Sequence, residues 1–506
     1  MAALAHAATN AAAAGTIGGC CLGGAAVMLG SKVLKLCLGK RASAPASAPE
    51  AEEDGPASEG RIPIFVMMPL DTVTDDCGGI KDPVKIKEWL VGLVASGVRG
   101  IMVDVWWGLC EPAPGKYRFH GYVELCQLCK DLGLKLQAVM SFHQCGGNVG
   151  DSVSIPIPAW ALEPAKTSGF LYQAKSGSVS QDCLSLSADR ERIFPAVGGG
   201  KRDALACYRE FMAAFASATA AFLGNVIVEI QVGMGPCGEL RYPSYMLSWG
   251  WNYPGVGLLM AYDSGMRRML AQAARTAPVF ANIPESAPTE QNGKPEDCPL
   301  FRAKGGGGQF RSGHGAFFLR WYSQVLLAHG DAVLREACAA FPAHLGSSLA
   351  FSVKVSGIHW HTMHPSRAAE TCAGYSPSPE GGVGAYTAIA RMLAHVGRDT
   401  GRRMLFNFTC LEMQNGANVP GDDSAPEDLI AEVRRACVQE GVPLCGENAL
   451  QFGLPESPWA LNQIGKQARG WAPGHDKMHS VTLLRLDEGF ARPSSLRTLR
   501  KWVATL

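Results

Sequence analysis

Short apolar runs and longer segments with helical spacing alternate along most of the chain. The apolar runs are rich in β-branched residues, which favours strands, whereas the intervening segments repeat apolar residues every three or four positions. The helical spacing is clearest in residues 85–94, 122–129, 317–327 and 429–438. We expect eight strands, within residues 62–70, 100–108, 135–143, 226–240, 349–360, 404–413, 442–450 and 480–486.

The order of these elements predicts the fold class. Strands that alternate with helices run parallel, because each return to the sheet needs a crossover connection. Eight such units across residues 61–506 predict an α/β protein built as a single (β/α)8 TIM barrel with long βα-loop insertions. An open doubly wound sheet is the alternative. The sequence has neither a G-x-G-x-x-G after the first strand nor a G-x-x-x-x-G-K-[ST] motif, so it offers no phosphate-binding loop.

Residues 1–60 differ in composition from the rest of the chain. No charged side chain occurs before Lys32, basic residues then follow, and the first acid is Glu50. Residues 42–60 are rich in Pro, Ala, Ser and Glu and contain too few apolar residues to order themselves. We expect an organelle transit peptide and a disordered linker over residues 1–60. A secretory signal, a membrane anchor and an untargeted tail are the alternatives.

The formal charge of the chain is nearly balanced, at +1. Proteins that bind nucleic acid use an excess of cations to displace counterions, so we expect no nucleic-acid partner. We also expect no stable membrane association. The 17 cysteines are odd in number and scattered through predicted strands and helices, which indicates reduced thiols rather than a disulfide framework.

Charged and polar residues lie where the predicted strands end. In a parallel barrel the carboxyl ends of all strands meet at one face, and the chemistry takes place there. One buried charge commonly has a structural partner, but charges at six strand ends are hard to explain by stability alone, since each is costly to desolvate. The residues concerned are Asp104, His143, Asp151, Glu239, Lys354, His359, Glu412, Glu447 and Arg485.

These side chains suit the binding and cleavage of a sugar. Carboxylates bind hydroxyl groups, and flat aromatic faces cover the C–H surfaces of a sugar ring. Glu239 and Glu447, on different strands, suit acid–base cleavage of a glycosidic bond. The alternative for Glu239 is a structural ion pair with Arg241. The tryptophans near the predicted site are Trp106, Trp107, Trp249, Trp251 and Trp360.

Histidines near the end of the fifth strand raise the alternative of a metal site. His359 and His361 are two positions apart, His364 follows, and His143 lies on another strand. Because the fifth strand is expected to end near His359, we favour hydrogen bonding to substrate over metal binding. We therefore predict neither a metal ion nor another cofactor.

Several long motifs resemble those of the plant-type β-amylases, glycoside hydrolase family 14. They are VDVWWG, LKLQAVMSFHQCGGNVGD, GPCGELRYPSY, VSGIHW, FTCLEM and CGENAL, and the similarity extends from about residue 62 to the end of the sequence. The family is a (β/α)8 barrel that releases β-maltose from the non-reducing ends of α-1,4-glucans with inversion at the anomeric carbon.

The resemblance implies roles for individual residues. Glu239 in GELRYPSY would be the general acid and Glu447 in GENAL the general base. Residues 146–151 match the mobile lid of the family, and Thr409 matches its inner loop. The two carboxyl groups of an inverting enzyme stand about 6.5–9.5 Å apart, which leaves room for a water molecule. The implied substrate contacts are Asp104, His143, Asp151, Lys354, His359, Thr409, Asn448, Ala449 and Arg485.

The resemblance also implies a partner and a compartment. The partner would be starch or another α-1,4-glucan, and the compartment would be the chloroplast stroma. A catalytically silent glucan-binding barrel of the same family and a retaining glycosidase are the alternatives. The sequence departs from the family pattern at His361 and after Leu450, so the outer sugar subsites stay open. The oligomeric state stays open as well, and a monomer is compatible with the sequence.

Overall fold

A computed structural model describes residues 60–147, 150–304, 308–311, 313–376, 383–416, 419–454, 456–471 and 476–506. The chain divides into two units, Met1–Arg61 and Ile62–Leu506. The predicted leader and linker therefore lie, apart from Gly60, outside the described residues. All helices and strands given below belong to the second unit.

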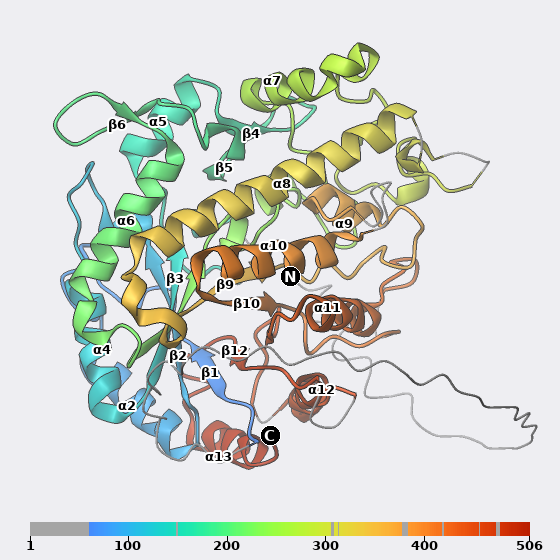
Figure 1. Ribbon diagram of the computed structural model, residues 1–506. Coiled ribbons are helices and arrows are strands. Elements are labelled where there is room, and N and C mark those ends of the chain that lie inside the picture. Colours follow the sequence, from blue (N-terminus) through green and yellow to red (C-terminus); the bar gives the residue numbers. More distant parts are fainter. Residues whose placement is uncertain are drawn as a thin grey trace, which may run out of the picture. The chain divides into compact units, whose positions relative to one another are not determined.

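Eight parallel strands close into a barrel (Figure 1). Around the barrel the strand order is β1–β2–β3–β8–β9–β10–β11–β12 and back to β1, and every neighbouring pair is parallel. This confirms the TIM barrel and rules out the open sheet. The strands are β1 (Ile64–Met67), β2 (Gly100–Trp106), β3 (Lys135–Ser141), β8 (Ile227–Val232), β9 (Ala350–Val355), β10 (Arg403–Phe408), β11 (Leu444–Glu447) and β12 (Val481–Leu483).

Helices between successive strands cover the outside of the barrel (Figure 1). Alternate strand residues such as Ile101 and Val103 pack in one core with helix residues such as Leu90 and Leu93. All four segments with clear helical spacing are helical. The main outer helices are α2 (Pro83–Ala95), α4 (His120–Leu132), α6 (Ala204–Ala218), α8 (Gly313–Ala340), α10 (Ala385–Thr400), α11 (Pro426–Glu440), α12 (Pro458–Arg469) and α13 (Pro493–Val503).

The predicted insertions carry small elements of their own. The insertion between β3 and α6 contains two antiparallel hairpins as well as a helix. The added strands are β4 (Leu171–Gln173), β5 (Val179–Leu184), β6 (Phe194–Pro195) and β7 (Lys201–Arg202), and the added short helices are α3 (Trp107–Cys110), α5 (Ala159–Thr167), α7 (Ser264–Ala273) and α9 (Ala368–Ala373).

Several strands are shorter than the sequence pattern predicts. β8 ends at Val232 rather than near residue 240, and β9 ends at Val355 rather than at residue 360. The apolar runs continue beyond these strands because the loops that follow are themselves buried, as at Leu240 and Ile358. Glu239, His359 and Arg485 therefore lie on loops after β8, β9 and β12, and not on the strands.

The inside of the barrel is more polar than its outside. Strand residues alternate between the helix-facing core and the barrel interior. The inward positions include a small apolar cluster of Met67, Met102 and Val139. The other buried inward positions are largely polar: Asp104, Gln137, Glu229, Gln231, Ser352, Lys354, Asn407, Glu447 and Thr482.

The thiol and membrane predictions can be compared with the described residues. All 14 described cysteines are free, which confirms reduced thiols for this part of the chain. Within the same residues no helix is both long and apolar enough to cross a membrane.

Candidate active site

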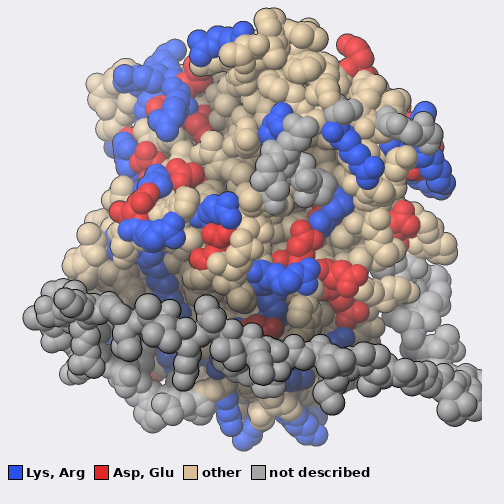
Figure 2. Space-filling model, turned by 45° about the vertical axis from the view of Figure 1, so that its right-hand side comes forward, with Lys and Arg blue, Asp and Glu red and all other residues tan. Residues whose placement is uncertain are grey.

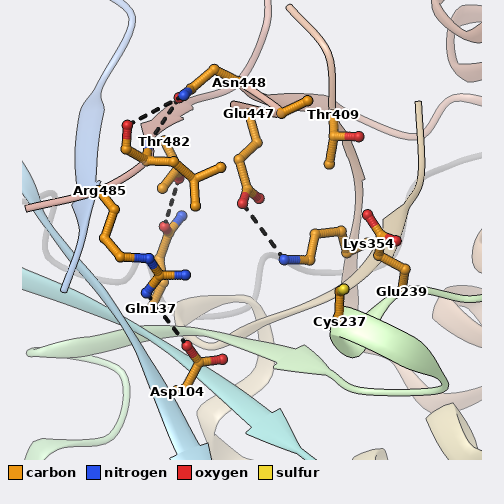
Figure 3. Close-up of polar contacts among 12 residues, drawn as sticks. Asp104, Gln137, Cys237, Glu239, Lys354, Thr409, Glu447, Asn448, Thr482 and Arg485 are labelled. Carbon is orange, nitrogen blue, oxygen red and sulfur yellow. Dashed lines mark hydrogen bonds and ion pairs between the residues drawn. The ribbon is translucent and has the colours of Figure 1, made fainter. Parts of the chain in front are cut away.

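Polar side chains from opposite sides of the barrel converge at the carboxyl ends of the strands (Figure 3). Asp104 comes from β2, Lys354 from β9 and Glu447 from the last position of β11. Glu239 and Arg485 reach the same region from the loops after β8 and β12. The structure therefore brings together the charged residues that the sequence placed at separate strand ends.

Glu447 lies beside a buried cation. Its Oε1 is 3.5 Å from the Lys354 ammonium, and both side chains are buried. Burial raises the pKa of Glu447; the positive charge of Lys354 opposes this rise and the negative charge of Glu239 adds to it. Burial lowers the pKa of Lys354, but the carboxylates of Glu447, Glu239 and Asp104 outweigh burial and raise it. Lys354 is therefore a fixed positive charge next to Glu447.

Glu239 is held by a tight turn and by an arginine. Its Oε2 accepts a hydrogen bond from Arg241 Nε at 2.6 Å, so the structural ion pair that the sequence allowed does form. A side chain at Gly235 would stand 2.5–2.6 Å from the backbone oxygens of Arg241 and Glu239, so only glycine allows this close return of the chain. A backbone bridge between Glu239 and Lys354 then fixes Glu239 beside β9.

Asp104 and Arg485 form the wall opposite Glu239. Asp104 Oδ1 accepts a hydrogen bond from Ser141 at 2.8 Å, and its Oδ2 is 3.8 Å from Arg485 Nη1. Arg485 also donates to the Met68 carbonyl at 2.7 Å. These contacts orient a carboxylate and a guanidinium at the edge of the site.

His143 is buried and neutral. Burial, together with the positive charges of Lys354 and Arg241, lowers its pKa to about 3. Its ring packs edge-on against Trp106, with centroids 5.3 Å apart, and its Nδ1 has no hydrogen-bond partner among the described residues. A neutral imidazole of this kind can exchange one hydrogen bond with an uncharged hydroxyl group.

Asp151 closes the loop of residues 146–151, which resembles the mobile lid of the β-amylase family. Its Oδ2 accepts hydrogen bonds from the backbone N–H groups of Gly146 and Gly147, at 2.8 and 2.9 Å. Residues 148–149, at the centre of that segment, lie outside the described residues. The Asp151 carboxylate thus holds the start of the loop against its end.

Thr409 and His359 belong to two loops that contact each other. The Gly357 N–H donates to Thr409 Oγ1 at 2.7 Å, and His359 Nδ1 lies 3.0 Å from the Gly357 carbonyl. Burial lowers the pKa of His359, which keeps this ring neutral too. His359 and Thr409, both predicted to contact the sugar, are thus buried in the loops that follow β9 and β10.

Asn448 and Ala449 play a more structural part than their predicted role suggests. The Asn448 amide donates to the Leu450 carbonyl at 2.7 Å and accepts from the Leu484 N–H at 2.8 Å, so its side chain ties two loops together. Ala449 is exposed and donates its N–H to Glu412. A sugar contact in this segment would involve the backbone near Ala449.

Glu412 is the buried carboxylate that orders the loop after Glu447. Its oxygens accept the N–H groups of Ala449 at 3.0 Å and Leu450 at 2.7 Å. Burial raises its pKa to about 7, although the Leu450 and Ala449 N–H groups lower it. The FTCLEM motif marks this glutamate in the sequence, but its contact with the CGENAL segment becomes visible only in the folded chain.

The tryptophans form packing contacts more than open sugar platforms. Trp107 is fully buried in the core against Phe142 and Trp160, so it presents no open face to a sugar. The ring centroids of Trp251 and Trp360 are 5.5 Å apart, and the indole N–H groups of both residues donate to the Gly255 carbonyl. They shape the loop beside His359 rather than exposing a flat face.

The histidines near the end of β9 contact different groups. His361 Nε2 lies 2.7 Å from the Pro254 carbonyl, and His364 contacts Glu296 at 3.0 Å. The described residues contain no cluster of three or more His, Cys, Asp or Glu side chains with metal-binding geometry.

Comparison with known proteins identifies the family. Residues 65–501 match the sequence model of glycosyl hydrolase family 14. The chain belongs to glycosyl hydrolase family 14. A protein named β-amylase 2, chloroplastic, from Oryza sativa subsp. japonica is 43% identical, over 90% of this chain and 80% of the relative. A β-amylase from Medicago sativa is 38% identical, over 88% of this chain and 87% of the relative.

A solved family member has the same architecture. The crystal structure of the catalytic domain of β-amylase from Paenibacillus polymyxa superposes with a TM-score of 0.68 at 27% sequence identity. The match covers 88% of this chain and 98% of that chain. Family 14 membership therefore rests on sequence and on fold, and the convergent carboxylates lie within the matched residues.

Proposed function

We propose that this family 14 protein is a β-amylase, an exo-acting hydrolase that releases β-maltose from the non-reducing ends of α-1,4-glucans with inversion. The observation that carries the proposal is a pair of buried glutamates, Glu239 and Glu447, on different sides of one barrel mouth with Lys354 between them (Figure 3). Two carboxyl groups in unlike surroundings are what acid–base cleavage of a glycosidic bond needs.

Glu447 is the proposed general base. Lys354 favours the ionised form of Glu447. Oε2 of Glu447 is buried without a hydrogen-bond partner among the described residues. An ionised oxygen of this kind can take a proton from a water molecule as that water attacks the anomeric carbon. Since burial raises the pKa of Glu447, the base becomes active only above the ordinary range of a glutamate.

Glu239 is the proposed general acid. Arg241 holds Oε2, so Oε1 is the oxygen that would carry the proton to the leaving glycosidic oxygen. The turn at Gly235 and the backbone bridge to Lys354 fix the position of this carboxyl group. The two roles together displace the leaving sugar from one face while water attacks the other, which inverts the configuration.

The remaining predicted residues would hold the sugar. Asp104 and Arg485 offer a carboxylate and a guanidinium to hydroxyl groups, and the neutral ring of His143 offers one further hydrogen bond. Asp151 would act through the loop that it pins. The other proposed contacts are Lys354, His359, Thr409, Asn448 and Ala449.

An uncharged polysaccharide suits the surface of the protein. Lys and Arg side chains are interspersed with Asp and Glu on the face drawn in Figure 2. Together with the overall charge of +1, this mixture gives no extended single-sign patch among the described residues visible on that face. A neutral α-glucan needs no such patch for binding.

The proposed site of action is the plastid. The relative from Oryza sativa is named chloroplastic, and residues 1–60 combine a lack of early acids with late basic residues. We assign residues 1–60 to a transit peptide with a linker and residues 61–506 to the catalytic barrel. Starch, the substrate implied for the enzyme, would be met in that compartment.

The first product formed from maltopentaose by the full-length protein tests the proposal. We expect the first product, whose length and anomeric form are followed by NMR from the earliest time points, to be maltose in the β form. An α anomer would indicate a retaining enzyme, and the absence of any product while starch is still bound would indicate a catalytically silent barrel. Either result would overturn the proposal.

A further inference from the structure

A hydrogen-bonded chain crosses the barrel interior beneath the proposed base. Thr482 Oγ1 on β12 donates to Gln137 Oε1 on β3 at 3.1 Å, and Gln137 Nε2 donates to Glu229 Oε2 on β8 at 2.7 Å. All three side chains are at least 97% buried. Thr482 is also the register neighbour of Glu447 on β11. Figure 3 shows Gln137 and Thr482 within the ring of active-site residues.

One carboxyl oxygen of Glu229 has no hydrogen bond within the described part of the chain. Oε1 of Glu229 is buried without a partner there, as are both amide atoms of Gln231 and the amide oxygen of Asn407. Ser352 adds a hydroxyl group, which can accept as well as donate. Oε2 of Glu229 already accepts from Gln137, so an ionised Glu229 would leave Oε1 as a charged acceptor without a donor, whereas a neutral carboxylic acid turns that oxygen into a donor. Buried polar groups are normally satisfied, which favours the neutral form.

The charges around Glu229 point the same way. Burial raises the pKa of Glu229 more than Ser352 and Gln137 lower it, and the negative charge of Glu447 raises it further. The positive charge of Arg403, the first residue of β10, acts against this rise. The Cys445 thiol also faces Glu229 and has a raised pKa, so it adds no charge there at neutral pH.

We propose that Glu229 is a positioning residue for the reaction: as a neutral carboxylic acid it anchors the chain Glu229–Gln137–Thr482 beneath Glu447 and adds no further negative charge near the base. Nothing in the proposed mechanism makes Glu229 touch the sugar. The inference rests on the proposed role of Glu447 as base. It adds a residue at the closed, inner end of the site to those that line its mouth.

The conservative variant Glu229→Gln separates the neutral from the ionised form. A glutamine accepts from Gln137 and supplies an N–H donor, as the neutral acid does, so kcat and the acid limb of the kcat/KM–pH profile should stay within about twofold of wild type. If Glu229 were ionised, Glu229→Gln would remove a negative charge and move the acid limb to lower pH. That shift would overturn the proposal. The exposed variant Glu163→Gln is the matched control.

Two variants break the chain and test its positioning role. Glu229→Leu leaves the buried Gln137 amide without its acceptor, and Thr482→Val removes the hydroxyl donor with little change in shape. We expect kcat to fall about tenfold in Glu229→Leu and about threefold in Thr482→Val, with KM within twofold, since the base moves but the sugar contacts stay. Unchanged kcat in both variants, or in Thr482→Val alone if Glu229→Leu fails to fold, would overturn the role.

Infrared difference spectra test the protonation state without substrate. Wild type minus Glu229→Gln, at the pH of highest activity, should show the C=O stretch of a protonated carboxylic acid. If the difference spectrum showed the stretching bands of a carboxylate in place of that C=O stretch, Glu229 would be ionised and the proposal would be overturned. This result does not depend on turnover, so it is distinct from a failure of the proposed maltose-releasing activity, which the wild-type product analysis decides.

Discussion

Glu447 and Glu239 lie at the same barrel mouth in contrasting surroundings. Glu447 ends a strand, its carboxylate is 3.5 Å from a lysine, and one oxygen has no hydrogen bond among the described residues. Glu239 follows a tight turn after β8 and has a 2.6 Å hydrogen bond from an arginine two residues away. The first pairing comes from distant parts of the sequence and the second is local.

This contrast shows how one barrel can give two glutamates separate tasks. A loose pairing with Lys354 keeps Glu447 ionised but leaves an oxygen available to water. The direct hydrogen bond from Arg241 orients Glu239 and commits one of its oxygens, so only the other can exchange a proton with substrate. Two residues of the same type therefore have different oxygens available to substrate and water at this site.

Removal of either carboxyl group should have the largest effect. We expect Glu239→Gln and Glu447→Gln each to lower kcat on starch by about 10²–10⁴-fold, the range for general acid–base catalysis. The two variants should differ on α-maltosyl fluoride, because fluoride leaves without a proton. Glu239→Gln should regain much of its activity on that substrate, and Glu447→Gln should not. Equal loss on both substrates would remove the distinction between the two roles.

Substitution of Lys354 should affect Glu447 in a pH-dependent way. Its positive charge lowers the pKa of Glu447 against burial, so Lys354→Met raises that pKa further. The base is then ionised only at higher pH, and the acid limb of the kcat/KM profile should move upward by about one pH unit or more. Lys354→Arg, which keeps the charge, is the control. An acid limb that stays in place would show that Lys354 does not act on the base.

Glu412 should make stability depend on pH between about 4.5 and about 7. Its folded pKa of about 7 lies above the ordinary 4.5, so the folded protein holds a proton that the unfolded chain releases in this window. The free energy of unfolding of wild type relative to Glu412→Gln should therefore fall as pH rises, by up to about 1.4 kcal/mol per pH unit. Urea titrations of both proteins measure this difference, and a constant difference would contradict the raised pKa.

An exposed ion pair should show the smallest effect. Lys466 contacts Glu427 at 2.7 Å, but its side chain is 59% exposed, in contrast to the buried Lys354. Water screens such a pair, so we expect Lys466→Gln to change the free energy of unfolding by no more than about 1 kcal/mol and leave kcat unaltered. A loss of activity comparable to that of Lys354→Met would mean that burial does not explain the contrast between the two lysines.

Much of the fold could be predicted from periodicity, because local pattern and tertiary structure agree along this chain. All eight apolar runs contain a barrel strand, and the segments with helical spacing are helices. The extents of the strands could not be predicted where a buried loop continues an apolar run, as after Val232 and Val355. Burial alone does not distinguish a strand from an irregular loop packed under a helix.

The candidate site was predicted less evenly. Glu239, Lys354 and Glu447 stand out as charges in apolar runs, and the structure brings them together. Trp107 was selected as an aromatic residue beside a strand end and proved to be core, because such a residue can point to either side of the strand. Glu412 acts through the backbone of another loop, which no spacing along the sequence can indicate.

The barrel, its family and the polar residues near its mouth could be predicted from the sequence, since these depend on local pattern and on motifs. The pairings emerge only in the folded chain: Lys354 with Glu447, Glu412 with the Ala449 backbone, and Gln137 between Glu229 and Thr482. They could not be predicted because burial, charge and hydrogen bonding depend on separation in space. The closed barrel makes neighbours of residues that lie from 37 to 345 positions apart along the chain.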